Sequence, residues 1–176
     1  VRGRRTARAY PPAVAARMSG RTQTTALADL RATRAFAVLT LDGRKWLLPQ
    51  AEIQALESLL DIDREVRIPH SVGAVAFAGE WWPVYCLSGE LQLLQRPPDG
   101  RRACPLLDNG ADRFGLVCDQ VETLTVAPRL LAPPACMALP DSPIQALVLL
   151  NDELGCVTTT EHLAALLAAV VENVDG

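Results

Sequence analysis

Short apolar segments separated by turn residues dominate the chain from residue 35 onward. Residues 36–41 and 45–48 are mostly apolar, and Asp42-Gly43 between them is a dipeptide favoured in two-residue hairpin turns. The same pattern recurs in four later segments: 104–107, 113–118, 144–150 and 154–157. Strands of this length with frequent turns predict a mainly β protein, and the run 144–150 is apolar enough to predict a central strand.

The segment from Val72 to Leu87 has the most distinctive pattern. It reads as two strands hinged at Gly79-Glu80, and the second strand carries two adjacent tryptophans. Because successive side chains point to opposite faces, we expect one of Trp81 and Trp82 to be buried and the other to face a partner. Pro83 has no N–H to donate, which predicts an edge strand or a bulge there. The alternative is a hairpin that lies wholly inside a core.

Helical signals lie at the two ends of the patterned region. Residues 25–34 are compatible with a short helix packed on the body. Near the C-terminus, Thr158-x-x-Glu161 predicts a capping box. An amphipathic helix follows, because five apolar residues share one helical stripe: Leu163, Leu166, Leu167, Val170 and Val171. Residues 128–143 are rich in proline and are expected to be irregular.

Charge is distributed unevenly along the 176 residues. Residues 1–34 contain eight arginines and one acidic residue, whereas the whole chain has a net charge of −3. We predict a disordered basic tail over 1–34, a single folded domain over 35–171 and a short end over 172–176. Met18, followed by Ser-Gly-Arg-Thr, fits a natural start. The acidic body disfavours nucleic-acid binding, and without a secretory signal or a membrane-length apolar run we expect a cytoplasmic protein with no membrane insertion.

No specific catalytic or metal-binding pattern is present. The cysteines lie at positions 86, 104, 118, 136 and 156, and no C-x-x-C pair occurs among them. Most have apolar neighbours, which predicts buried, reduced thiols. Neither His70 nor His162 lies beside an acidic or cysteine motif. We therefore expect no enzyme activity, no catalytic residues, no metal and no cofactor.

Several short motifs, in order, resemble the CheW-like domain family of bacterial chemotaxis. They are Arg67-Ile-Pro, Gly73 and Gly79 at a spacing of six, Pro83-Val-x-x-Leu87, and Arg113-x-Gly-Leu-Val-x-Asp119-x-Val121. The resemblance covers residues 35–171. It implies two SH3-like five-stranded β-barrel lobes packed together, with a C-terminal amphipathic helix. It also implies an adaptor that couples a histidine kinase regulatory domain to a chemoreceptor-like protein.

The chain departs from the family pattern where partners are expected to bind. The family's Asn and Arg before the hinge fall on Ala76 and Ala78, its aspartate after the second strand falls on Cys86, and a glutamate falls on Ala55. The linker between Pro69 and Gly73 is also about four residues shorter than the family pattern implies. These changes replace charge with apolar surface. The candidate partner-binding residues are Ala55, Ala76, Phe77, Ala78, Gly79, Trp81 and Trp82.

Three readings of function follow. The leading one is a non-enzymatic adaptor of a chemosensory pathway. The second is a divergent CheW-like interaction module with a different partner, or one that self-associates through the tryptophan-bearing hairpin. The third, based only on the five cysteines, is a small thiol-dependent enzyme.

Overall fold

The structure, a computed structural model, describes residues 23–174, which form two five-stranded sheets and two α-helices. The first sheet has the strand order β8-β1-β2-β10-β9 and consists of β1 (Phe36–Leu41), β2 (Arg44–Pro49), β8 (Gln120–Thr123), β9 (Ala146–Leu150) and β10 (Glu153–Val157). The second sheet has the order β3-β6-β7-β5-β4 and consists of β3 (Ile53–Ser58), β4 (Gly73–Phe77), β5 (Glu80–Cys86), β6 (Ala103–Asp108) and β7 (Arg113–Val117). We call the two sheets the first and second lobes.

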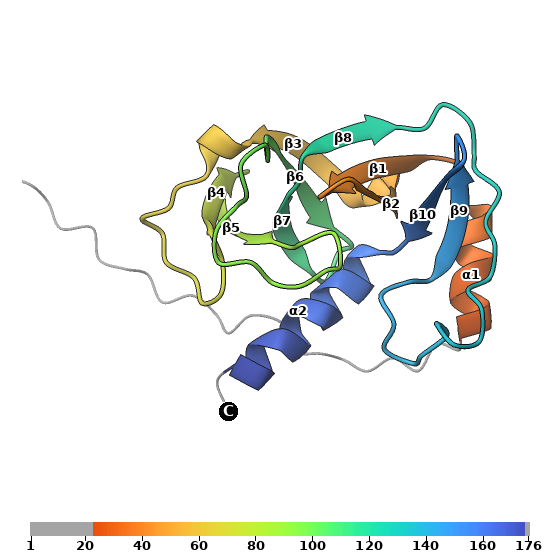
Figure 1. The fold of residues 1–176 in the computed structure, drawn as a ribbon. Helices are drawn as coiled ribbons and strands as arrows, with labels where there is room; N and C mark the ends of the chain where they lie inside the picture. The colour runs from red at the N-terminus through yellow and green to blue at the C-terminus, as the bar shows by residue number, and fades with distance from the viewer. Residues whose placement is uncertain (1–22, 175–176) are drawn as a thin grey trace, which may run out of the picture.

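The remaining elements connect the lobes or cover them. Helix α1 (Gln23–Ala32) lies on the outer side of the first lobe, and α2 (Thr160–Val174) runs beneath both lobes (Figure 1). Two short 3-10 turns, η1 (Gln50–Glu52) and η2 (Leu59–Asp61), flank β3. The architecture is that of two SH3-like lobes with a C-terminal helix, which confirms the predicted fold class.

The buried core of residues 23–174 consists of three apolar clusters. Each lobe has an inner core, and a third cluster lies between the lobes and includes Leu163 and Leu167 of α2. Strand β1 contributes to two clusters, because Phe36 points into the first lobe whereas Leu39 points into the shared cluster. Every residue of β1 is buried. This burial of both faces explains why β1 is a continuous apolar run and not an alternating one.

Two strands occupy positions other than those predicted. Strand β5 is internal, with β4 on one side and β7 on the other, so the expectation of an edge strand is wrong. Pro83 is tolerated because the pairing of β5 with β7 begins only at Val84. Conversely, the apolar run 144–150 forms β9, an outer strand of its sheet and not a central one. Its outer face is apolar, since Leu149 is 61% exposed.

The predicted short helix near residue 25 is confirmed as α1, which packs on the first lobe. Leu30 is buried in the inner core of that lobe, together with Phe36 and Leu130. The predicted domain boundary at residue 34 assigned this helix to a disordered tail. The expectation of disorder is therefore wrong for residues 23–32. The rest of the expected tail, residues 1–22, lies outside the described residues.

Helix α2 is present as predicted, but its N-terminus is capped differently. The hydroxyl of Thr158 is buried without a hydrogen-bond partner, so the predicted capping box does not form. Instead, Thr159 Oγ1 accepts from His162 N at 3.3 Å, and Glu52 Oε2 accepts from Thr160 N at 2.7 Å. The η1 turn therefore supplies a carboxylate to the positive end of the helix, which fastens α2 to the junction of the lobes.

Candidate partner-binding surface

The β4–β5 hairpin ends in a two-residue turn at the surface of the second lobe. Phe77 pairs with Glu80, so the central turn residues are Ala78 (φ 50°) and Gly79 (φ 81°). The hinge therefore lies one residue before the predicted Gly79-Glu80. Positive φ at both central positions is the geometry of a type I′ turn, which matches the twist of the two strands.

The two tryptophans of β5 lie on opposite faces, as predicted. Trp81 is 41% exposed, whereas Trp82 is 4% exposed and belongs to the core of the second lobe. The alternative of a hairpin wholly inside a core is therefore wrong. The ring of Trp82 meets Phe77 edge-on, with 5.5 Å between the centroids, and Arg113 lies over its ring at 5.9 Å.

The structure brings only some of the predicted site residues to one surface. Exposed side chains or backbone at the hairpin belong to Ala76, Ala78, Gly79 and Trp81. Phe77 is half-buried, and Trp82 is buried beneath the hairpin. Ala55 lies on β3, at the opposite end of the strand order, and packs partly against the core of the same lobe. That these residues bind a partner stays a prediction.

Ion pairs border the exposed hairpin. Arg113 contacts Glu80 at 3.2 Å and Asp108 at 3.0 Å, and its side chain is about half exposed. Exposed pairs of this kind contribute roughly 0–1 kcal/mol to stability. They give the hairpin a polar border around the apolar surface of Trp81, the arrangement common at protein interfaces.

A buried arginine that the sequence analysis missed joins the two lobes. Arg101 Nη2 donates to Asp42 Oδ1 and to Leu87 O, both at 2.8 Å, and Nη1 donates to Val117 O at 3.0 Å. Its Nε lies 3.1 Å from Asp119 Oδ1, at an angle outside that of a hydrogen bond, so this contact is ionic. Asp42 and Asp119 belong to the first lobe, whereas the two carbonyls belong to the second.

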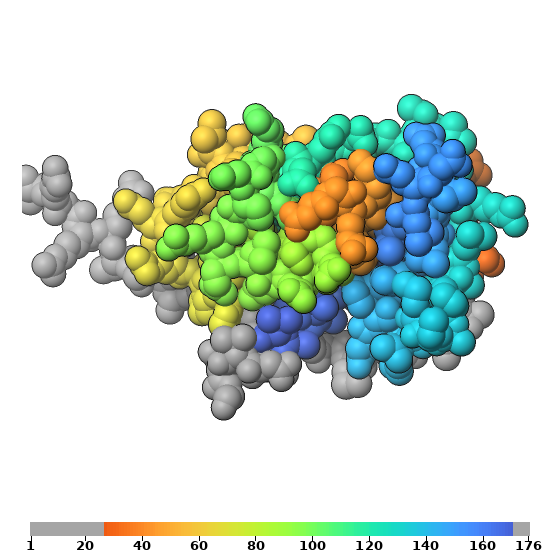
Figure 2. Space-filling view, viewed as in Figure 1, coloured from red at the N-terminus to blue at the C-terminus, as the bar shows by residue number. Residues whose placement is uncertain are grey.

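The backbone completes this network. Asp42 Oδ2 accepts from Gly89 N, and Asp119 Oδ2 accepts from Asp42 N, each at 2.8 Å. In Figure 2 the β1–β2 hairpin of the first lobe, in orange, lies on the surface between the green part of the second lobe and the blue β9–β10 part of the first lobe. Nothing in the local sequence marks Arg101, because it follows Gly100 in a proline-rich loop and precedes the exposed Arg102. Its role depends on segments distant in the sequence.

Three thiols are buried and hard to ionise. Burial raises the pKa of Cys86 to about 11, against the opposing effect of Arg101, and raises the pKa of Cys104 and of Cys118 to about 12. Burial also raises the pKa of the half-buried Cys156. Cys136 is exposed. The prediction of buried, reduced thiols is thus confirmed for three of the five, and their raised pKa is the opposite of what a cysteine nucleophile requires.

Cys86 is fully buried at the end of β5. This position, which the sequence pattern matched to an aspartate of the CheW-like family, therefore offers no surface to a partner. Among residues 23–174, no group of three or more His, Cys, Asp or Glu side chains is arranged to hold a metal ion. Burial lowers the pKa of His162, whose Nδ1 lies 2.7 Å from Thr159 Oγ1 at the start of α2. His162 therefore takes part in the hydrogen bonding at the N-terminus of α2.

Comparison with known proteins identifies the fold. No protein-family model matches the chain, and no curated protein matches its sequence. Among solved structures, the scaffolding protein TtCheW from Thermoanaerobacter tengcongensis superimposes with a TM-score of 0.59 at 14% identity, covering 74% of this chain and 92% of TtCheW. The fold is CheW-like. The chain is therefore a divergent example of the CheW-like architecture that the ordered motifs suggested.

The motifs on which the resemblance was based lie at structurally important positions of the two lobes. Gly73 and Gly79 bracket β4, and Gly115 is packed so closely that an added Cβ would lie 2.8 Å from Cys104 Sγ. Asp119 is the acidic partner of Arg101. No helix among the described residues is long and apolar enough to cross a membrane.

Proposed function

We propose that the protein is a cytoplasmic, non-enzymatic adaptor of a chemosensory pathway that links a histidine kinase regulatory domain to a receptor-like protein. The observation that carries this proposal is the likeness to a CheW scaffolding protein across most of both chains. The raised pKa of the buried thiols supports a non-catalytic role. The exposed β4–β5 hairpin, with Trp81 at its surface, is the proposed contact for the receptor-like partner.

The test measures binding to the purified regulatory domain of the histidine kinase encoded nearest to this gene. Titration calorimetry is expected to show a saturable complex. If no such domain binds at a concentration of about 100 µM, near −5.5 kcal/mol of binding free energy, the adaptor proposal is wrong.

Trp81→Ala tests the hairpin as the receptor contact. An aromatic anchor at an interface contributes about 2 kcal/mol, so the affinity for the cytoplasmic tip of the neighbouring receptor should fall about 30-fold. Kinase binding should persist. Val126→Ala is the matched control, because Val126 is an apolar residue that is 77% exposed in the loop after β8. If Trp81→Ala and Val126→Ala lose the same affinity for the receptor, the β4–β5 hairpin is not the receptor contact.

A second candidate is an interaction module that binds the kinase without a receptor, or that self-associates through the same hairpin. Ala76 and Ala78 favour it, because both are exposed where the related family carries an amide and a guanidinium group. Sedimentation analysis distinguishes the two. A dimer that Trp81→Ala converts to a monomer supports self-association, whereas a monomer that binds a receptor supports the adaptor.

A further inference from the structure

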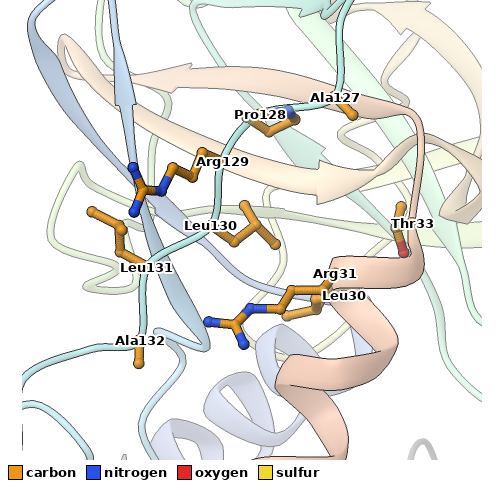
Figure 3. A pocket seen from close by; sticks show the side chains of 9 residues that line it. All are labelled: Leu30, Arg31, Thr33, Ala127, Pro128, Arg129, Leu130, Leu131 and Ala132. Atoms are coloured by element: carbon orange, nitrogen blue, oxygen red, sulfur yellow. The ribbon is translucent and has the colours of Figure 1, made fainter.

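A groove lies between the end of α1 and residues 127–132 of the first lobe, far along the chain from the β4–β5 hairpin. Its volume is ≈ 450 Å³, within the range of roughly 300–1,000 Å³ that is typical of ligand sites. Leu30 and Leu130 form its floor, and Arg31 and Arg129 lie at its margins. Figure 3 shows both arginine side chains extending toward the same end of the groove, where Leu131 and Ala132 lie.

The floor of the groove is fixed by the core beneath it. Leu30 and Leu130 are 4% and 7% exposed, and both belong to the inner core of the first lobe. The loop wall is held as well, because Leu131 and Leu147 of β9 exchange two backbone hydrogen bonds of 2.8 Å. Such a preformed groove requires little ordering when a ligand binds.

The two arginines differ from three arginines at the junction of the lobes and at the β4–β5 hairpin. Arg44, Arg101 and Arg113 each have a carboxylate partner. Arg31 and Arg129 are exposed, and neither forms an ion pair with any residue of the described range 23–174. The groove thus holds two positive charges that no carboxylate of residues 23–174 pairs with, on a chain whose net charge is −3.

The end of α1 does not cancel this positive charge. A helix C-terminus carries about half a negative charge, but Thr33 already donates to two of the terminal carbonyls. Its N donates to Leu30 O at 3.1 Å, and its Oγ1 donates to Asp29 O at 3.2 Å. Among the residues that line the groove, the charged side chains are the two guanidinium groups.

We propose that this groove binds a short acidic segment of a partner protein that carries a leucine-like anchor between carboxylates. Leu131, which lines the groove and is 43% exposed, can contact an apolar side chain, and each guanidinium can hold a carboxylate with two parallel hydrogen bonds. An anionic membrane fits less well, because two arginines contribute only about 1 kcal/mol each at a lipid surface. The proposal is independent of the adaptor function, since it rests on another face of the molecule.

The test uses the full chain and a fluorescein-labelled synthetic peptide of alternating leucine and glutamate, read by fluorescence anisotropy. Replacing the peptide's glutamates by glutamine, or its leucines by serine, should weaken binding about tenfold or more. The double variant Arg31→Glu/Arg129→Glu should lose the acidic peptide to the same extent, and it should gain affinity for a version with lysine in place of glutamate.

The matched control is Arg64→Glu/Arg102→Glu, which changes the net charge equally at exposed arginines of the second lobe. Binding by this control should stay within about twofold of the parent, and denaturation midpoints should show that both variants fold. If the control loses as much peptide affinity as Arg31→Glu/Arg129→Glu, the loss comes from the change in net charge, and the proposal is wrong. Binding of phosphatidylserine vesicles, but not of the peptide, through Arg31 and Arg129 would also overturn it, as would no peptide binding at about 1 mM.

Discussion

The β1–β2 and β4–β5 hairpins close with the same backbone turn but have opposite surroundings. Asp42 and Gly43 have φ values of 50° and 80°, and Ala78 and Gly79 have 50° and 81°. The first turn is fastened at the junction of the lobes, because the Asp42 carboxylate accepts from Arg101 and from Gly89. The second turn carries a methyl group at the equivalent position and faces solvent.

This difference shows that the turn geometry alone does not decide what a hairpin does. In the first hairpin a side chain at the left-handed position connects two lobes, and the hairpin is structural. In the second hairpin that connection is absent, so the end of the hairpin is available to a partner. The side chain at the first turn position thus distinguishes the two hairpins. The carboxylate of Asp42 fastens the β1–β2 hairpin to the second lobe, whereas the methyl group of Ala78 leaves the β4–β5 hairpin exposed for the binding that we propose.

Replacing Arg101 should have the largest effect on the first hairpin. Arg101→Ala leaves the carboxylates of Asp42 and Asp119 near one another without their cation, and it leaves the carbonyls of Leu87 and Val117 without their donor. The guanidinium is buried but the two carboxylates are partly exposed, so the loss of its charged hydrogen bonds should cost about 3 kcal/mol of unfolding free energy.

Urea denaturation measures the loss from Arg101→Ala. The control Arg102→Ala removes the exposed neighbouring arginine and should change stability by less than about 0.5 kcal/mol. If the two variants lose the same amount, Arg101 does not join the lobes energetically, and the contrast between the hairpins fails.

Exchanging the turn residues tests the comparison directly. Asp42→Ala converts the first turn into the Ala-Gly turn of the second hairpin, so its cost combines the lost side-chain contacts with about 0.5 kcal/mol for the poorer tolerance of alanine for positive φ. The loss of charged hydrogen bonds to Arg101 and Gly89 should cost about 2 kcal/mol. Ala78→Asp, the reverse exchange, should change stability by about 0.5 kcal/mol or less, because that side chain is exposed at the surface. Comparable effects in both variants would contradict this account.

The stability of the second lobe, which contains the second hairpin, should respond to alkaline pH through its buried thiols. The pKa of Cys86 is raised to about 11, and those of Cys104 and Cys118 to about 12, from an ordinary value of 9.0. The protonated thiol is therefore favoured in the folded state. The stability this gives is fully present below pH 9 and is lost as the pH rises from 9 toward 11–12.

Denaturation at a series of pH values measures this loss, and a Cys104→Ala/Cys118→Ala variant should show a flatter decline above pH 9. At pH 8, iodoacetamide should label the exposed Cys136 well before the three buried thiols. Rapid labelling of Cys86, Cys104 or Cys118 in the folded protein would contradict their burial and revive the thiol-enzyme reading.

Local signals in the sequence predicted the strands well, but contacts across the fold determined the rest. The dipeptide Asp42-Gly43 predicted the position of the first turn correctly, because both residues tolerate positive φ. The second turn was placed one residue late, because alanine at a left-handed position goes against local preference. Arg101 and Arg102 are neighbours of the same type, and only the distant Asp42 and Asp119 decide which is buried.

The same limit applies to the helix end and to the candidate surfaces. The predicted cap used a threonine close in sequence, whereas the actual carboxylate comes from Glu52, which is 108 residues away. For the hairpin, alternation correctly predicted that one tryptophan would be buried. Alternation could not indicate that Arg31 and Arg129 lie beside one groove, because a loop and a helix come together there only in the folded chain.

Relieving the strain in the second turn should have the smallest effect. Ala78 adopts φ 50°, a region in which a Cβ costs about 1 kcal/mol and which asparagine tolerates better. Ala78→Asn should therefore raise the unfolding free energy by about 0.5 kcal/mol, as measured by urea denaturation. Ala76→Asn is the control, because Ala76 is an exposed strand residue of the same hairpin, where asparagine is disfavoured. A gain at Ala78 with a loss at Ala76 would show that the second hairpin keeps a strained turn whose side chain stabilises nothing, which is the property that distinguishes it from the hairpin at Asp42.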